Sequence, residues 1–248
     1  MKLAPVNFRP TVSYLATLKA INYTPHHAIA EFIDNSLQSY IDNKPRLKNL
    51  HNNYKLKIHI RINSGSIEIE DNAAGISNND YHRAFQTALK PKKQTGLSEF
   101  GMGMKTAACW FCSYWSVKSK ALGEDIEKTI KVDVTKMADG NIEWVPPEGE
   151  KSPKNKHGTL VRLEKLQQPV RGASVANVKR HLTSIYREFI KRNEIEIRYN
   201  DEILKFEYPF KVLVGPLQED LEKQVKNPKS RIWKRKFVFT FKIDCKHK

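Results

Sequence analysis

The sequence predicts an α+β fold with a mostly antiparallel sheet, and three observations predict it. Alternating apolar residues in KLKIHIRI and IEIED, joined by the turn sequence NSGS, indicate a β-hairpin. Segments 26–41 and 173–192 instead repeat their apolar residues at helical spacing. Helices and hairpin strands then follow one another in mixed order, without the strand–helix alternation that is typical of a parallel sheet.

In the first half of the chain, proline placement and polar breaks set the expected boundaries. Pro25 suits the first turn of a helix, whereas Pro45 in a polar stretch favours a loop. A Ser/Asn cap precedes the next helical segment. The expected elements are a helix at 11–20, a helix from Pro25 or His26 to Ile41, a loop at 42–54, strands at 55–62 and 67–71, a helix at 78–89 and a loop at 90–98.

In the second half, short apolar runs between polar breaks indicate strands, and one long amphipathic segment indicates a helix. The expected elements are a helix at 103–111, strands at 114–119, 126–134, 142–145 and 158–166, a loop at 146–155, a helix at 173–192, and strands near 195–199, 203–206 and 237–243. The polar segment 167–172 is taken as a boundary, which gives one domain at 1–168 and a second at 169–248.

Composition limits the class of protein. The chain has 248 residues with 40% hydrophobic residues, no apolar run of membrane-spanning length and no secretory leader, so we expect an intracellular protein without a membrane partner. Three cysteines, an odd number, argue against a disulfide framework. A formal net charge of +16 indicates a polyanionic partner, either a nucleic acid such as DNA or an acidic protein, although lysines that only keep the protein dispersed would give the same value.

The helix at 26–41 places polar residues together. Glu31, Asp34, Asn35 and Gln38 follow the i, i+3, i+4, i+7 spacing, so they share one face. Glu31 is a candidate general base for a water, and Asn35 offers an amide oxygen to a hard cation such as magnesium. An ordinary solvated helix face would show the same pattern.

Two glycine-bearing segments follow. Asp71 ends the strand before DNAAG, where small residues up to Gly75 would let a flat purine ring approach the backbone; an ordinary turn is the alternative. In GLSEFGMGMKTAA, glycines precede Lys105 and a helix start, which is suited to phosphate. This segment is neither a Walker A loop nor a Rossmann fingerprint.

Taken in order, AIAEFIDNS, IEDNAAGI, SEFGMGMKTA and GTLVRL resemble the four nucleotide motifs of the GHKL or Bergerat-fold ATPases, with MORC and MutL relatives the most similar. The resemblance covers about residues 10–166 and implies a two-layer sandwich with helices on one face. It also implies bound ATP and magnesium. By this likeness Glu31 activates the attacking water, Lys105 meets the phosphates, and Asn35 holds the metal. The residues expected at the nucleotide are Asp34, Asn35, Asp71, Gly75, Ile76, Gly101, Met102, Gly103, Met104, Lys105, Thr106 and Thr159.

The same resemblance implies more than binding. Residues 77–100 would form a lid that closes over ATP, with ATP-dependent dimerisation, and the segment from residue 169 resembles the start of a transducer-like domain. We expect a fragment of a longer protein that hydrolyses ATP and acts on DNA. Ala73 departs from the family pattern, which has glycine after Asp-Asn. The rival interpretations are a nucleic-acid-binding module with a relict pocket and a histidine kinase.

Other reactive residues are interpreted as structural. Cys109 and Cys112 form C-x-x-C inside a predicted buried helix, so two small core residues are the better interpretation than a metal or redox site. His26, His27 and His157 lie at element ends, where neither a ligand role nor a catalytic role is favoured.

Overall fold

The computed structural model of the chain describes residues 14–50, 53–86, 102–140 and 142–206. Its strands are β1 (Leu56–Ile62), β2 (Ser66–Asp71), β3 (Cys112–Lys120), β4 (Ile126–Asp133), β5 (Glu148–Lys151), β6 (Gly158–Leu166), β7 (Ile195–Tyr199) and β8 (Glu202–Ile203). They form one sheet in the order β5-β4-β3-β6-β2-β1-β7-β8. The pairing of β1 with β7 is parallel, and the other neighbours pair antiparallel.

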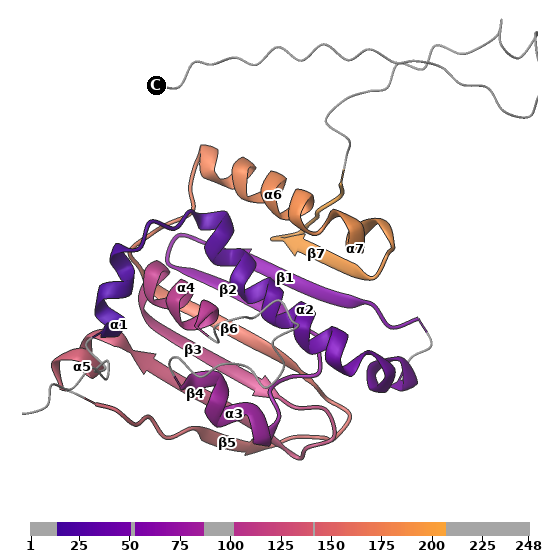
Figure 1. Cartoon of the computed structure of the whole chain (residues 1–248), viewed down its shortest axis with the longest axis horizontal. Coiled ribbons are helices and arrows are strands. Elements are labelled where there is room, and N and C mark those ends of the chain that lie inside the picture. Colours follow the sequence, from indigo (N-terminus) through magenta and orange to yellow (C-terminus); the bar gives the residue numbers. More distant parts are fainter. Residues whose placement is uncertain (1–13, 51–52, 87–101, 141, 207–248) are drawn as a thin grey trace, which may run out of the picture. The chain divides into compact units, whose positions relative to one another are not determined.

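Helices cover one face of this sheet. They are α1 (Tyr14–Thr17), followed by a 3₁₀ turn at Leu18–Ala20, then α2 (Pro25–Leu50), α3 (Asn78–Phe85), α4 (Gly103–Phe111), α5 (Val134–Asp139), α6 (Ala173–Ile185) and α7 (Arg187–Lys191). Figure 1 shows α2 crossing the sheet with α4 beside it. Ion pairs lie between polar strand side chains, such as Arg61 with Glu70 and Arg162 with Glu68. The predicted α+β fold with a mostly antiparallel sheet is confirmed.

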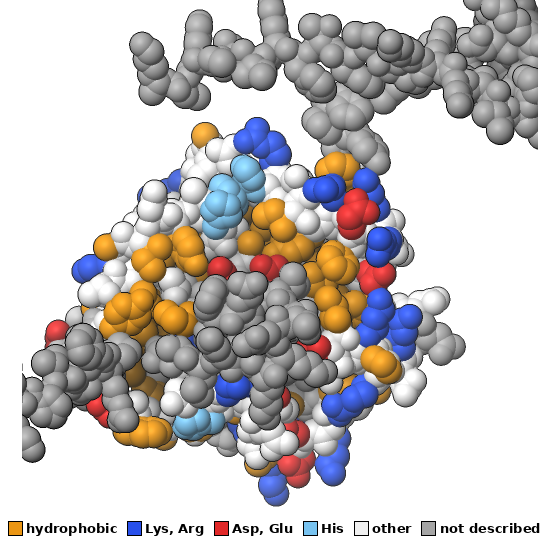
Figure 2. All heavy atoms as spheres, in the orientation of Figure 1, with side chains coloured by type: hydrophobic (Ala, Val, Ile, Leu, Met, Phe, Trp, Pro, Cys, Tyr) orange, Lys and Arg blue, Asp and Glu red, His pale blue; other side chains and the backbone are white. Residues whose placement is uncertain are grey.

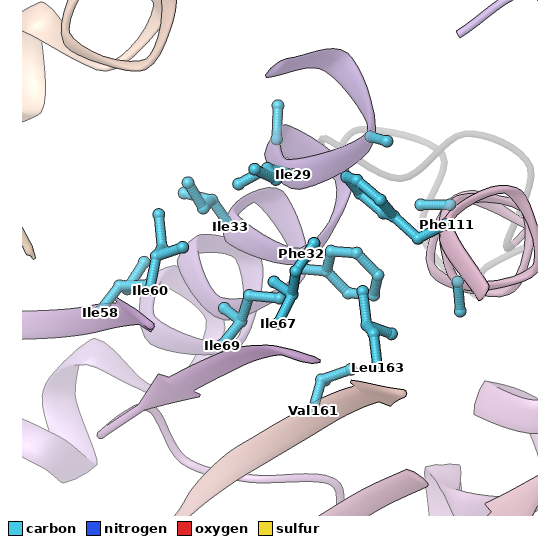
Figure 3. Packing of buried hydrophobic residues seen from close by; sticks show 14 of the residues in the cluster. Ile29, Phe32, Ile33, Ile58, Ile60, Ile67, Ile69, Phe111, Val161 and Leu163 are labelled. Atoms are coloured by element: carbon cyan, nitrogen blue, oxygen red, sulfur yellow. The ribbon is translucent and has the colours of Figure 1, made fainter. Parts of the chain in front are cut away.

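The core lies between α2 and the central strands. Ile29, Phe32 and Ile33 of α2 point toward Ile58 and Ile60 of β1 and toward neighbouring strand residues (Figure 3). Each of these side chains is at most 2% exposed. Burying one such side chain contributes about 1.5–3 kcal/mol, so this contact fixes the rotation of α2 about its axis. The polar side of α2 is thereby turned away from the sheet.

The helix α2 is longer than predicted, because it continues through Pro45 to Leu50. The expected loop at 42–54 is therefore wrong over most of its length. Leu47 is fully buried, Lys44 pairs with Glu194 at 2.6 Å, and Arg46 donates to the Leu122 carbonyl at 2.9 Å. These contacts outweigh the cost of about 3 kcal/mol that an internal proline imposes on a helix.

The segment after β4 also differs from the prediction. The strand expected at 142–145 is wrong, and a strand forms instead at Glu148–Lys151, where a loop was expected. Trp144 is 75% exposed, so its apolar character does not reflect burial. The edge strand β5 is exposed on both faces and is held by backbone pairing with β4, which leaves no pattern in its side chains. The short helix α5 was not predicted; the Asp133 carboxylate caps it by accepting the Lys136 N–H.

The amphipathic segment 173–192 forms two helices rather than one. Tyr186 separates α6 from α7 with φ −96° and ψ 14°. Beyond the boundary expected at residue 168, β7 still joins the sheet beside β1, and α6 packs on α2. The described residues on both sides of 168 thus share one sheet, and the start of a second domain at 169 stays a prediction.

Some predictions fall on other parts of the chain. The first residues of the helix at 11–20, the end of the helix at 78–89, the loop at 90–98 and the strand at 237–243 lie outside the described residues. Where the chain is described, no helix has the length and apolar character needed to cross a membrane.

Candidate functional site

The carboxylate of Glu31 lies against the first residue of α4. A Cβ added at Gly103 would stand 1.9 Å from Glu31 Oε2, so only glycine leaves room for this approach. The Tyr23 hydroxyl donates to Glu31 Oε1 at 3.3 Å. Burial raises the pKa of Glu31, and the nearby Asp34 carboxylate raises it further. Figure 2 shows red acidic side chains near the middle of the molecular face in view, bordered by orange hydrophobic side chains.

Asp34 lies one helical turn beyond Glu31 and is bound from a different element. The Tyr186 hydroxyl lies 2.7 Å from Asp34 Oδ1 and 3.1 Å from the Ala30 carbonyl oxygen. Burial raises the pKa of Asp34, and the hydrogen bond from Tyr186 opposes this effect. The acidic face of α2 is therefore partly covered by the junction of α6 and α7.

Asn35 is exposed and uses only one end of its amide. Its Nδ2 donates to the Glu31 carbonyl at 2.8 Å, and no described residue engages its Oδ1. An oxygen fixed in this way fits a hard cation that keeps most of its waters. The described residues contain no group of three or more His, Cys, Asp or Glu side chains that could hold a metal ion.

Asp71, at the end of β2, is held by three donors. Its Oδ2 accepts from Ser36 Oγ at 2.7 Å, and its Oδ1 accepts the N–H groups of Ala73 at 2.8 Å and Thr159 at 3.2 Å. Burial raises the pKa of Asp71 to about 6, against the opposing effect of these hydrogen bonds. Because Ser36 belongs to α2 and Thr159 to β6, one carboxylate ties three segments together.

Glycine permits close packing around this carboxylate. Gly75 has φ +71°, and a Cβ there would lie 2.0 Å from the Lys120 carbonyl oxygen. Gly158 has φ +134°, and its Cβ would lie 2.3 Å from the Asp71 carbonyl oxygen. Ile76, which follows Gly75, donates its N–H to Ser119 Oγ at 2.9 Å, and the Ser119 hydroxyl is 3.0 Å from Thr159 Oγ1. The loop after β2 is thus fastened to β3 and β6.

Ala73, the departure from the family pattern, is accommodated without strain. Its side chain is 1% exposed and belongs to the hydrophobic core, and it has no positive φ. Its N–H donates to Asp71, while its carbonyl oxygen accepts from His157 Nδ1 at 2.8 Å. The extra methyl group therefore fills part of the core.

The start of α4 holds the remaining predicted residues. Met102 is the N-cap and supplies no side-chain cap, and its carbonyl accepts the Thr106 N–H at 2.9 Å. Met104 packs against the core. Lys105 is 4% exposed and donates to the Ala84 carbonyl at 2.8 Å. Burial, with a smaller contribution from Arg83, lowers the pKa of Lys105 to about 8.

Lys105 is therefore bonded to the end of α3 rather than to the acidic face of α2. Gly101 lies outside the described residues, as do residues 87–100 of the predicted lid. The structure thus brings together Glu31, Gly103 and the loops around Asp71 through α2, whereas Lys105 points elsewhere.

Sequence reasoning missed four side chains of the site. Ser36 and Ser119 fasten Asp71 and Ile76, and the tyrosine hydroxyls of residues 23 and 186 bind the acidic residues of α2. Ser36 is the last residue of the motif AIAEFIDNS, so its place there was a usable signal. Tyr186 lies 152 residues from Asp34, and no local pattern marks such a contact.

The cysteines and histidines fit the structural interpretation. Cys109 and Cys112 are buried, and burial raises their pKa values to about 11 and 12. His26 stacks on His181 of α6 with ring centroids 3.8 Å apart. Figure 2 shows pale-blue histidine side chains gathered between α2 and α6. These rings act as packing groups between the two helices.

Three features together fit a domain of the GHKL type. They are a mostly antiparallel sheet, a helix with acidic residues on one face, and loops whose close packing requires glycine. The model of the family described as histidine kinase-, DNA gyrase B-, and HSP90-like ATPase matches residues 23–159, which is more than half of the chain. The chain therefore belongs to this family of GHKL-type ATPase domains. No curated protein matches it significantly. The matched range includes Glu31, Asp71, Gly103 and Thr159, and it ends before Tyr186.

Proposed function

We propose that the chain binds ATP with magnesium and hydrolyses it at the face built on α2. One observation carries this proposal: α2 contacts both glycine-bearing segments at once. Glu31 lies against Gly103 at the start of α4, and Ser36 binds Asp71 at the end of β2. We place the purine beside Asp71 and the triphosphate beside the start of α4.

At the purine end, Asp71 is the proposed partner of the adenine amino group. An ionised carboxylate has about four lone-pair positions, and three are taken by Ser36, Ala73 and Thr159. One position remains for an incoming N–H. Thr159 borders this carboxylate through its N–H, and the loop with Gly75 and Ile76, packed on β3, is the proposed wall beside the ring.

At the phosphate end, the first turn of α4 is the proposed anion site. The helix has nine residues, and its N-cap Met102 supplies no side-chain bond, so we propose that its first N–H groups bind the phosphates. Residues Gly101 to Thr106 would surround the phosphates. Lys105 would join them by exchanging the Ala84 carbonyl for a phosphate oxygen, which is favourable because a carbonyl gives a buried ammonium no counter-charge and no described residue forms an ion pair with it.

Glu31 is the proposed general base for the attacking water. Burial and the neighbouring Asp34 charge raise its pKa, which makes the carboxylate a better proton acceptor near neutral pH. The Tyr23 hydroxyl orients one oxygen, and the contact with Gly103 sets the position of the other. Asn35 Oδ1 would hold the magnesium ion, which supplies charge neutralisation for the phosphates when bound.

The test is the substitution Glu31→Ala, with Asp42→Ala as a matched control on an exposed position of the same helix. Removing the base is expected to leave binding of ATP in place while the turnover rate falls by about tenfold or more. Asp42→Ala should keep the rate of the unchanged chain. Hydrolysis at the full rate in Glu31→Ala would show that another group takes the proton.

Further proposals rest on the resemblance to the GHKL ATPases and on the charge of the chain. We infer that the chain is most similar to MORC and MutL proteins. We also infer that residues 77–100 close over ATP, that this closure drives dimerisation, and that residues 169–248 begin a second domain. The net charge of +16 supports DNA as the partner. Binding of DNA that weakens steeply with salt, and that depends on ATP, would support this; binding indifferent to ATP would favour a relict pocket.

A further inference from the structure

Tyr186 occupies the break between α6 and α7. It is the C-cap of α6 and the N-cap of α7, with φ −96° and ψ 14°. The side chain is 2% exposed, although its neighbours Ile185 and Arg187 are exposed. The break therefore turns one tyrosine inward, toward α2, at a point 27 residues beyond the range that the family model matches.

The hydroxyl of Tyr186 meets the functional helix at two atoms of one turn. It lies 2.7 Å from Asp34 Oδ1 and 3.1 Å from the Ala30 carbonyl oxygen. A hydroxyl has one proton, and the charged carboxylate is the stronger acceptor, so the proton goes to Asp34. In a regular helix the Ala30 carbonyl accepts the N–H of Asp34, so the hydroxyl lies beside the Asp34 carboxylate and beside the carbonyl to which the Asp34 backbone bonds.

This turn carries the groups that the proposed chemistry uses. Glu31 follows Ala30 directly, and Asn35 follows Asp34 and donates to the Glu31 carbonyl. A side-chain shift at Asp34 would therefore move a charge beside Glu31 and disturb the turn that presents Asn35. A displacement of about 1 Å of a catalytic group can cost a factor of about one hundred in rate.

Packing and hydrogen bonding at this junction are separable. Val178 and Leu182 of α6 are 1% and 0% exposed and belong to the hydrophobic core, so they hold α6 in place without the hydroxyl. The ring of Tyr186 fills its own buried volume. Replacing tyrosine by phenylalanine keeps this ring and removes only the hydroxyl.

We propose that Tyr186 is a positioning residue for the nucleotide site, whose hydroxyl fixes the Asp34 carboxylate and thereby the turn of α2 that presents Glu31 and Asn35. This inference rests on the proposed function of that turn. It makes the segment after residue 168 a structural part of the ATPase site.

The experiment compares Tyr186→Phe with Tyr199→Phe, a buried tyrosine on β7 whose hydroxyl makes no hydrogen bond with any described residue. For each variant, kcat, KM and thermal stability are measured, together with amide hydrogen exchange of residues 30–35 without nucleotide. Tyr186→Phe should lower kcat by about tenfold with KM changed by less than about threefold, and exchange at 30–35 should become about fivefold faster. Tyr199→Phe should change neither kcat nor the exchange rate at residues 30–35.

A double-mutant cycle with Asp34→Ala tests the route of the effect. If Tyr186 acts through Asp34, adding Tyr186→Phe to Asp34→Ala costs no further kcat. Equal kcat and equal exchange in Tyr186→Phe and the unchanged chain, or a full additional loss in the double variant, would overturn the inference. An unchanged chain that does not hydrolyse ATP would instead refute the proposed function, and the exchange measurement would still decide whether Tyr186 holds the turn.

Discussion

The substitution Gly103→Ala separates the position of the proposed base from the stability of the fold. The added Cβ would lie 1.9 Å from Glu31 Oε2 and 2.8 Å from its Cδ, far inside contact distance. The obstacle is the end of a flexible side chain, so the Glu31 carboxylate is expected to rotate away by an ångström or more. Alanine also has less conformational freedom than glycine in the unfolded chain, which partly offsets the cost of this rotation.

The expected result is a folded protein with a misplaced base. The melting temperature of Gly103→Ala should stay within a few degrees of the unchanged chain, while the rate of ATP hydrolysis falls by a factor of about ten to one hundred. Steady-state turnover and thermal unfolding measure the two quantities. Gly65→Ala is the matched control, because nothing lies within 4 Å of the Cβ it would add. Hydrolysis by Gly103→Ala at the full rate would refute the reasoning.

Three further predictions concern titration and thiol reactivity. The pKa of Asp71 is raised to about 6, so nucleotide affinity measured by calorimetry should fall by about tenfold for each pH unit below 6, and Asp71→Asn should bind weakly at every pH. Because this pKa lies above the unfolded value of about 3.9, the Asp71 contribution to stability is present below pH 4 and declines as the pH rises through 6. In urea unfolding, the free energy of unfolding of Asp71→Asn should therefore fall less between pH 4 and pH 6 than that of the unchanged chain. An equal fall in both proteins would contradict this assignment. Burial raises the pKa values of Cys109 and Cys112 to about 11 and 12, so both should resist alkylation at pH 8 until the chain unfolds, as mass spectrometry can show.

Local patterns predicted several elements. The strand at 158–166 was predicted with the bounds that the structure gives, because its apolar residues alternate. The helix at 103–111 was also predicted with its bounds, although all of its residues from Lys105 to Phe111 are buried. Longer-range contacts decided the rest. Pro45 was taken as a helix breaker, yet Leu47 and the Lys44–Glu194 pair hold the last turns of α2.

The candidate site shows the same division. The helical spacing of Glu31, Asp34 and Asn35 was readable from sequence, as was the carboxylate of Asp71 at a strand end. The hydrogen bond from Tyr186 was not, since it depends on a helix break that places a distant residue over α2. Lys105 shows the converse, because a lysine after glycines predicts a phosphate contact, whereas its ammonium bonds Ala84.

The most direct measurement is thermal unfolding of the chain with a non-hydrolysable ATP analogue and magnesium. If Asp71 and the start of α4 bind one nucleotide, a concentration one hundred times the dissociation constant stabilises the fold by about 2.7 kcal/mol, and the melting temperature rises by several degrees. Asp71→Asn should show no such rise at the same concentration. A melting temperature of the unchanged chain that does not move at saturating nucleotide would contradict the account.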